Sequence, residues 1–303
     1  MRVNTTVNIG GLVLKNPVMT ASGTFGYGLE FEEYVNLNKL GAIVVKGIAL
    51  NPVKGNKPQR LVETPAGIMN AIGLQNVGVE AFISEKLPLL KKYSTPVIAN
   101  IYGTDVDGYI KVAQRLNDSA TAAVEINISC PNVKKGGLQF ASDKDAIATM
   151  MNGIKKVFTR PVIVKLSPNT GNIEEMAQVC EDNGADAVSL INTLVGLSIN
   201  LKTRRPNIAN VFGGLSGPAI KPVALAMVHK VSKKIKIPII GIGGIMNTTD
   251  ALEFIVAGAS AVQIGTANFV DPSITGIIAD GIKSYLDDNG INSITELTGT
   301  LEY

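Results

Sequence analysis

Short runs of hydrophobic residues recur along nearly the whole chain, with polar or amphipathic stretches between them. Each run is about five residues long and rich in Val and Ile, and several begin at Pro. Runs that are apolar at every position, instead of at alternate positions, are typical of strands buried on both faces of a parallel sheet. The pattern predicts eight such strands: Pro17–Ala21, Ala42–Lys46, Pro96–Ile101, Ala123–Ile128, Pro161–Leu166, Ala187–Asn192, Pro238–Gly243 and Ala261–Gly265.

The segments between these runs are long enough for helices that cross from one strand to the next. The expected helices include Asp105–Asn117, Asp143–Phe158, Ile173–Asn183, Ala219–Ile235 and Thr248–Ala257. Eight strand-then-helix units predict an α/β fold of the (β/α)8 TIM-barrel type. A doubly wound sheet is the alternative, but it usually carries a G-x-G-x-x-G turn after its first strand. Here the first strand ends in Thr20-Ala21-Ser22-Gly23, which favours the barrel.

Several features exceed a minimal barrel. Residues Val3–Val7 and Leu12–Leu14 flank Gly10-Gly11 and predict a hairpin that closes the bottom of the barrel. Long loops are expected after the second strand (Asn51–Val77), after the fourth, and after the sixth (Val195–Gly217). Because loops at the carboxyl ends of barrel strands border the catalytic mouth, we expect these to form walls or lids. We expect residues 1–303 to form one domain.

Composition removes several classes of function. The 303 residues include 28 Lys and Arg and 25 Asp and Glu, and the net charge of +3 is too small and dispersed for nucleic-acid binding. One His and two Cys exclude a His-rich metal site and a four-cysteine cluster within this chain, so we expect no metal. We find no stretch that is long and apolar enough for a membrane span, and no apolar core of a secretion signal. These features predict a cytoplasmic protein with no membrane or nucleic-acid partner.

The carboxyl ends of the predicted strands carry the candidate chemistry, because barrels concentrate their sites there. The residues at or just after these ends are Lys46, Asn100, Asn127, Lys165, Asn192, Thr193, Gly243, Gly244, Gly265 and Thr266. The glycines after strands seven and eight indicate a phosphate held by backbone N–H groups, with simple turns as the alternative. The side chains of Asn70, Asn127, Asn132 and Asn192 could bind a ring that alternates C=O and N–H groups, although each one alone is typical of a turn.

Two lysines and a cysteine are the candidate reactive groups. Lys46 and Lys165 each end an apolar run, where a cation is costly unless it meets an anion or a polar ligand. They could stabilise negative charge on a ring or substrate, or act as Schiff-base nucleophiles. Cys130 follows the fourth strand, where a thiolate would be a good base or nucleophile. Cys180 is expected in the middle of a helix with its side chain in the hydrophobic core, and His229 on the surface of another helix.

Four motifs together closely resemble the class 1 dihydroorotate dehydrogenases, and the likeness runs from about Leu12 to Asp271. They are Asn127-Ile128-Ser129-Cys130-Pro131-Asn132, Met69-Asn70-Ala71-Ile72-Gly73-Leu74-Gln75-Asn76, Ile191-Asn192-Thr193 and Gly214-Leu215-Ser216-Gly217-Pro218. Within that class, Gly73-Leu74-Gln75-Asn76 and Val133-Lys134-Lys135-Gly136-Gly137 resemble the NAD-linked type, class 1B, more than the fumarate-linked type. One departure is Gly47-Ile48-Ala49-Leu50 after Lys46, where many relatives carry a threonine.

The resemblance implies an FMN-containing barrel that oxidises dihydroorotate to orotate in pyrimidine synthesis. Cys130 would remove the proton from C5 while hydride leaves C6 for flavin N5, and Lys46 would lie beside flavin and substrate. The residues that would hold the substrate are Lys46, Asn70, Gly73, Leu74, Asn127, Asn132, Asn192 and Thr193. Those that would hold FMN are Ser22, Lys46, Asn100, Asn127, Lys165, Ile191, Gly217, Gly243, Gly244, Gly265 and Thr266.

The resemblance also implies a partner protein. Electrons would pass from FMN to NAD through a second subunit that carries FAD and a [2Fe–2S] cluster. This chain has too few cysteines for such a cluster and no dinucleotide fingerprint. The expected assembly is a homodimer of this chain flanked by two partners, a heterotetramer. Three alternatives stay open: a Schiff-base aldolase-type barrel, a non-catalytic binding barrel, and a related flavoenzyme acting on dihydrouracil or dihydrothymine.

Overall fold

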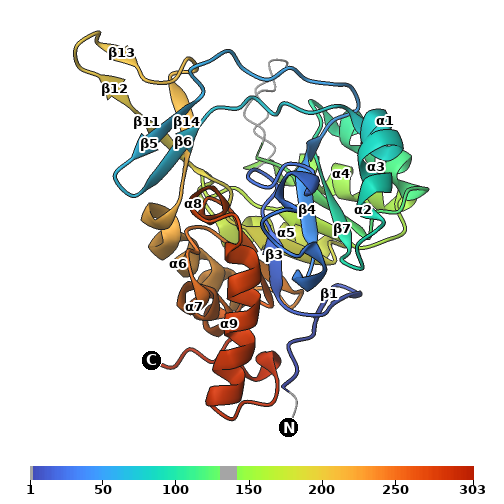
Figure 1. The fold of residues 1–303 in the computed structure, drawn as a ribbon. Helices are drawn as coiled ribbons and strands as arrows, with labels where there is room; N and C mark the ends of the chain where they lie inside the picture. Colours follow the sequence, from blue (N-terminus) through green and yellow to red (C-terminus); the bar gives the residue numbers. More distant parts are fainter. Residues whose placement is uncertain (1–2, 130–141) are drawn as a thin grey trace.

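A closed barrel of eight parallel strands forms the centre of the molecule (Figure 1). The computed structural model describes residues 3–129 and 142–303. The barrel strands are β3 (Val18–Thr20), β4 (Ile43–Ile48), β7 (Val97–Ile101), β8 (Ala123–Asn127), β9 (Val162–Lys165), β10 (Ala187–Leu190), β15 (Ile239–Ile242) and β16 (Ala261–Ile264). They pair in the order β3-β16-β15-β10-β9-β8-β7-β4, and a parallel bridge between Met19 and Ala42 joins the two ends. All eight predicted strands and the barrel fold are therefore confirmed.

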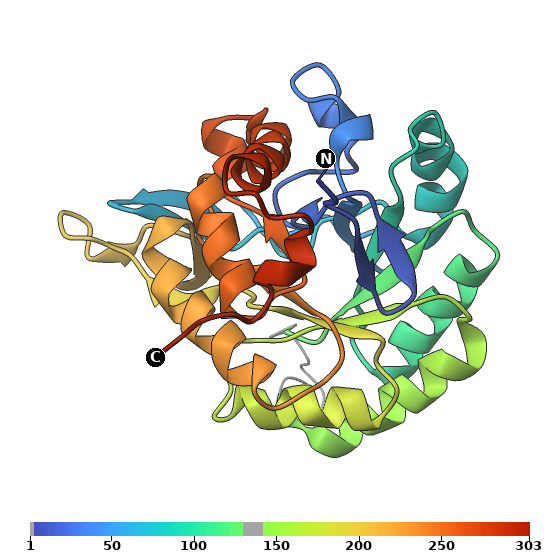
Figure 2. The same cartoon turned by 90° about the horizontal axis from the view of Figure 1, so that it is seen from below.

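Helices surround the barrel, as the view from below shows (Figure 2). They are α1 (Val79–Ala81), which continues through a π-helical turn (Phe82–Lys86) into α2 (Leu87–Leu90), α3 (Val106–Asn117), α4 (Lys144–Val157), α5 (Ile173–Asp182), α6 (Lys221–Ser232), α7 (Thr248–Ala257), α8 (Ala267–Val270) and α9 (Ile274–Asp288). Short 3-10 helices cover Leu29–Phe31, Leu37–Lys39, Pro218–Ile220 and Ile294–Leu297. Side-chain caps define several helix starts: Asp105 accepts a bond from the Gly108 amide at 2.8 Å, and Asp143 from the Ala146 amide at 2.9 Å. The helices expected from the sequence are present with small shifts at their ends.

An N-terminal hairpin closes the bottom of the barrel (Figure 2). Its strands are β1 (Val7–Ile9) and β2 (Leu12–Leu14), which pair antiparallel. The expectation that the first strand covers Val3–Val7 was wrong, because a two-residue turn at Gly10-Gly11 pairs the residues that flank it directly. Both glycines have positive φ, and a Cβ on Gly10 would overlap the backbone of Asp186. The hairpin thus packs closely against the barrel floor.

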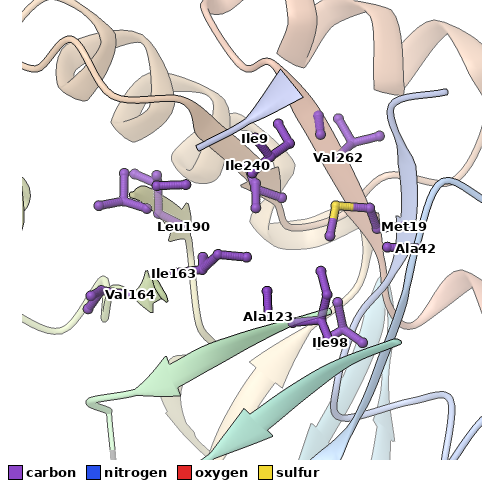
Figure 3. Packing of buried hydrophobic residues seen from close by; sticks show 14 of the residues in the cluster. Ile9, Met19, Ala42, Ile98, Ala123, Ile163, Val164, Leu190, Ile240 and Val262 are labelled. Atoms are coloured by element: carbon purple, nitrogen blue, oxygen red, sulfur yellow. The ribbon is translucent and has the colours of Figure 1, made fainter. Parts of the chain in front are cut away.

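The interior of the barrel is filled by aliphatic side chains (Figure 3). Met19, Ile98, Ile163 and Val262 come from four different strands and are fully buried. Ile9 of the hairpin reaches the same cluster from below. This packing fills the lower half of the barrel, and the active sites of such barrels lie at the opposite end, where the strands have their carboxyl ends.

The two long inserts form one small sheet above the mouth of the barrel, rather than irregular loops. Its strands are β5 (Leu61–Thr64) and β6 (Gly67–Asn70) from the insert after β4, and β11 (Leu194–Leu197) and β14 (Phe212–Ser216) from the insert after β10. They pair antiparallel in the order β11-β14-β6-β5. A second hairpin, β12 (Ile199–Asn200) and β13 (Arg205–Pro206), extends outward from this mouth sheet (Figure 1). Most of the loop expected after the fourth strand lies outside the described residues.

Candidate functional site

A cavity of about 610 Å³ lies at the carboxyl ends of the barrel strands, below the mouth sheet. Its volume is within the range of small-molecule and cofactor sites. The structure describes sixteen of the eighteen residues predicted from the sequence as site residues, and all sixteen line this cavity: Ser22, Lys46, Asn70, Gly73, Leu74, Asn100, Asn127, Lys165, Ile191, Asn192, Thr193, Gly217, Gly243, Gly244, Gly265 and Thr266. The other two, Cys130 and Asn132, lie outside the described residues.

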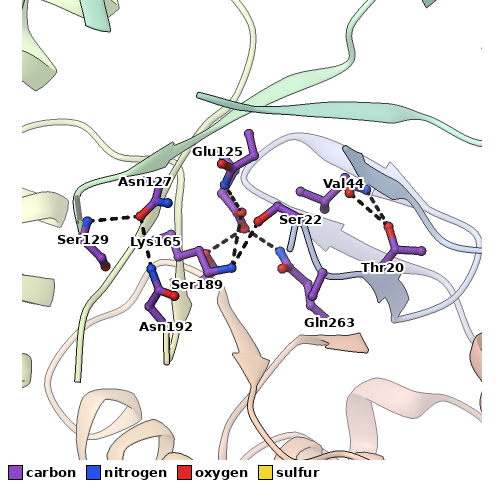
Figure 4. Close-up of polar contacts among 12 residues, drawn as sticks. Thr20, Ser22, Val44, Glu125, Asn127, Ser129, Lys165, Ser189, Asn192 and Gln263 are labelled. Carbon is purple, nitrogen blue, oxygen red and sulfur yellow. Dashed lines mark hydrogen bonds and ion pairs between the residues drawn. The ribbon is translucent and has the colours of Figure 1, made fainter. Parts of the chain in front are cut away.

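Two asparagines at neighbouring strand ends orient each other (Figure 4). Asn192 Nδ2 donates to Asn127 Oδ1 at 3.2 Å, and the backbone amide of Ser129 donates to the same oxygen at 3.1 Å. Asn192 Oδ1 in turn accepts from the amide of Thr193 at 2.8 Å. These bonds fix the orientation of both side chains at the cavity. The Ser129 hydroxyl is buried beside them and has no hydrogen-bond partner among the described residues.

The glycines at the ends of β15 and β16 bring bare backbone to the cavity wall. Gly243 and Gly244 have φ of 135° and 72°, and Gly217 has φ of 100°. A Cβ on Gly244 would lie 2.8 Å from Gly217 O and 2.8 Å from Lys221 N. Only glycine fits here, because a larger residue would be both strained and in contact with backbone. Such a wall suits a group, for example a phosphate, that backbone N–H groups approach closely.

The two candidate lysines have different surroundings. Lys46 is half-buried at the end of β4; burial lowers its pKa, the Arg60 charge lowers it further, and Glu30 opposes both. Lys165 is buried, with its Nζ 3.4 Å from the hydroxyl of Ser22 and 3.9 Å from a carboxylate oxygen of Glu125. This ion pair with Glu125 suits a role in binding better than a Schiff base, which needs the Lys165 nitrogen free to attack a carbonyl.

The segment Gly73-Leu74 is held in a strained conformation at the cavity edge. Leu74 has φ of 57°, which is uncommon for a residue with a side chain. Its carbonyl accepts hydrogen bonds from the Tyr102 hydroxyl and from Asn76 Nδ2, each at 2.9 Å. Asn76 Nδ2 also donates to the Tyr102 hydroxyl at 2.7 Å. The strain is therefore balanced by a buried polar cluster at the end of β7.

Three residues of this region were not among the predicted site residues: Tyr102, Asn76, which stood in a motif of the resemblance, and Glu125. Tyr102 and Asn76 donate hydrogen bonds to the carbonyl of Leu74, and no local sequence pattern predicts such a contact. Glu125 lies inside the apolar run Ala123–Ile128 and is fully buried. An acidic residue within a buried strand was a readable signal, since Glu is almost never fully buried unless paired. Glu125 lies within β8 and not at its carboxyl end, where the candidate residues were expected.

The other titratable residues singled out in the sequence lie away from the cavity lining. Cys180 is fully buried in α5, and burial raises its pKa to about 12, which agrees with its expected place in the core. His229 is half-buried on α6, with its Nδ1 3.4 Å from the carbonyl of Ala257. Within residues 3–129 and 142–303 no group of His, Cys, Asp and Glu is placed to hold a metal ion, and no helix of that part is long and apolar enough to cross a membrane.

Comparisons with known proteins point to one family. Residues 4–286 match the family model described as dihydroorotate dehydrogenase. Three curated relatives carry the name dihydroorotate dehydrogenase B (NAD(+)), catalytic subunit. The protein of Geobacter sulfurreducens is 57% identical over 297 residues, which are 98% of this chain and 97% of the relative. That of Geotalea uraniireducens is 56% identical over 296 residues, 97% of each chain. That of Pelobacter propionicus is 54% identical over 303 residues, 100% of each.

A solved structure shows the same fold at much lower identity. The crystal structure of DHODH in complex with ferulenol from Eimeria tenella matches with a TM-score of 0.80 and 22% identity. The match covers 98% of this chain and 88% of that chain. At that identity the similarity extends to the fold alone.

Proposed function

The chain belongs to the dihydroorotate dehydrogenase family, and we propose that it is the catalytic subunit of an NAD-linked enzyme that oxidises dihydroorotate to orotate in pyrimidine biosynthesis. The observation that carries the proposal is the cavity itself. Sixteen residues that the strand ends or the family resemblance predict, spread over the whole barrel, line one cavity of suitable size. Amides, a cation and bare backbone therefore converge on one ligand space, as a pyrimidine ring with a carboxylate and a phosphate-bearing cofactor require.

FMN is the cofactor that this cavity fits. Gly217, Gly243 and Gly244 line the cavity, and a Cβ on any of them would meet neighbouring protein atoms. Their bare backbone suits a phosphate, which backbone N–H groups can approach closely. Lys165 and Asn100 present a cation and an amide to the same cavity, which suits the polar edge of the flavin ring. Ser22, Ile191, Gly265 and Thr266 complete the set proposed to hold it. When bound, FMN supplies the acceptor for a hydride from the substrate.

The chain's own residues would bind the substrate and move its proton. Asn70, Asn127, Asn192 and Thr193 would pair with the ring amides and carbonyls, and Gly73 and Leu74, which line the same cavity, would add backbone contacts. Lys46 would balance the carboxylate. Cys130 would take the proton from C5, since a thiolate in a polar mouth is a competent general base. This role and that of Asn132 rest on the motif, because both residues lie outside the described part of the chain.

A partner subunit belongs to the same proposal. The relatives are named as catalytic subunits, which implies that they work with another protein. We propose that the partner carries FAD and a [2Fe–2S] cluster and that two such partners flank a homodimer of this chain. With two cysteines in 303 residues, the chain offers fewer than the four ligands that a cluster usually needs. A cytoplasmic location and a single FMN-binding domain over residues 1–303 stay predictions.

The test uses the purified chain and anaerobic spectroscopy. We expect the protein to carry a yellow flavin that bleaches on addition of dihydroorotate, and not on addition of dihydrouracil, which lacks the carboxylate. NAD reduction should require the added partner. A colourless protein, bleaching by dihydrouracil at an equal rate, or trapping of substrate on a lysine by borohydride would each overturn the proposal.

A further inference from the structure

A fully buried carboxylate, Glu125 on β8, lies among polar side chains from several barrel strands, including Lys165, Ser189 and Gln263 (Figure 4). Its exposed fraction is 0%, and it is absent from the cavity lining. An ionised group in such a place persists only when partners replace the water it has lost. The structure supplies those partners from around the barrel.

Four strands besides β8, its own, present groups to Glu125. Asn100 Nδ2 on β7 donates to Oε1 at 2.6 Å. Ser189 Oγ on β10 and Gln263 Nε2 on β16 donate to Oε2 at 2.9 Å and 2.5 Å. Lys165 Nζ on β9 lies 3.9 Å from Oε1. The carboxylate therefore joins strands from both sides of the ring.

Two of these partners differ from the others because they also face the cavity. Lys165 and Asn100 line it, whereas Ser189 and Gln263 do not. Glu125 Oε1 is the oxygen that accepts from Asn100 and lies nearest Lys165, so one atom orients both cavity-facing groups. Ser189 and Gln263 hold the other oxygen and so fix the carboxylate itself.

We propose that Glu125 is a positioning residue for the flavin: it aims Lys165 and Asn100 into the cavity and balances the Lys165 charge, and so lowers the reduction potential of the bound FMN. The inference rests on the proposed function, because it requires FMN in this cavity. Reduced flavin carries more negative charge than oxidised flavin. An unbalanced ammonium would therefore favour the reduced form, and the buried carboxylate moderates that preference.

The matched test compares Glu125→Gln with Ser189→Ala. Glutamine keeps the shape of Glu125 and removes its charge. Gln263 can turn its amide to meet the new N–H donor, because Gln263 Oε1 has no partner among the described residues. Ser189→Ala removes one hydrogen bond to the same carboxylate and leaves the charge in place. Both variants lose a buried contact, so a role that is only structural would lower the melting temperature of both and leave the flavin unchanged.

The readouts are the FMN midpoint potential, from anaerobic titration against a redox dye, and the melting temperature of the flavin-free protein. In Glu125→Gln we expect the oxidised–reduced equilibrium of FMN to move about tenfold toward the reduced form, about 30 mV for a two-electron couple. In Ser189→Ala we expect the oxidised–reduced equilibrium of FMN to stay within about twofold of the wild-type value, which is less than about 10 mV for a two-electron couple. An unchanged potential in Glu125→Gln, or an equal shift in both variants, overturns the proposal.

A second variant, Glu125→Asp, tests the same proposal if Glu125→Gln does not fold. Glu125→Asp keeps the charge but is one methylene shorter, so it cannot hold both Asn100 and Lys165 at their present positions. We expect its potential to stay near the wild-type value while its dissociation constant for FMN rises about tenfold. An FMN affinity equal to that of the wild type would overturn the positioning role. If the wild-type chain itself neither binds FMN nor bleaches with dihydroorotate, the proposed function fails first and this inference falls with it.

Discussion

Replacing Tyr102 by Phe tests whether the strained loop at the cavity edge is held ready for substrate. The Tyr102 hydroxyl donates to the carbonyl of Leu74 at 2.9 Å and accepts from Asn76 Nδ2 at 2.7 Å. Phenylalanine removes both bonds and keeps the ring in place. The Leu74 carbonyl then keeps a single bond to Asn76, and its positive φ has less support.

The magnitude follows from these two bonds. A neutral hydrogen bond contributes about 0.5–1.5 kcal/mol net, and Asn76 compensates part of the loss by keeping its bond to Leu74. A residue held at an unfavourable backbone angle costs about 1–3 kcal/mol, which the surrounding contacts must offset. We therefore expect the ordered form of the loop to lose about 1–1.4 kcal/mol, which corresponds to about a five- to tenfold change in an equilibrium.

Substrate would have to order the loop as it binds, so the loss should appear in KM and not in kcat. Steady-state kinetics with dihydroorotate and a dye acceptor measure both, and FMN content per chain confirms that the flavin is retained. Tyr93→Phe is the control, because it removes a tyrosine hydrogen bond to Glu32 at the surface, away from the cavity. A KM unchanged in Tyr102→Phe, or a tenfold fall in kcat with KM constant, would refute the idea that this hydroxyl preorganises the loop.

Three further outcomes test the site. Cys130→Ser should lower kcat by about 10²–10⁴-fold, the usual contribution of a positioned general base. Its control is Cys180→Ala, on the buried face of α5, which should lower only the melting temperature. Equal rates for Cys130→Ser and wild type would exclude the thiol as base. Gly244→Ala should weaken FMN binding about tenfold in fluorescence titrations, because left-handed backbone costs about 1–2 kcal/mol for a residue with a Cβ. The control is Gly171→Ala, where a Cβ meets nothing within 4 Å, and it should bind FMN as the wild type does. Because burial lowers the pKa of Lys46, its positive form is lost at a lower pH than that of an exposed lysine. KM for dihydroorotate should therefore rise as pH increases through that lowered pKa, whereas Lys46→Met should bind dihydroorotate weakly at every pH. The same pH profile of KM in wild type and Lys46→Met would show that Lys46 does not bind the carboxylate.

The sequence alone determined the barrel. A strand buried on both faces needs apolar residues at every position, so each of the eight strands was readable as a short continuous run. The position of the site followed, because all strands of a barrel end on one face. Residues such as Lys165 and Gly243 could be assigned to that face without knowing what they touch.

Only the tertiary structure decided which distant residues meet. Asn70 and Gly214 pair across the mouth sheet although 144 positions separate them, and their strands are too short for their own pattern to specify a partner. Glu125 stood within a run that was correctly predicted as a strand, but a strand pattern does not say which oxygen of a buried carboxylate faces Asn100 and which faces Ser189. Periodicity and composition are local properties, whereas the pairing of a buried charge depends on groups that separate strands bring together. For this reason the sequence predicted the candidate residues, whereas only the fold shows that Glu125 contacts two of them, Asn100 and Lys165.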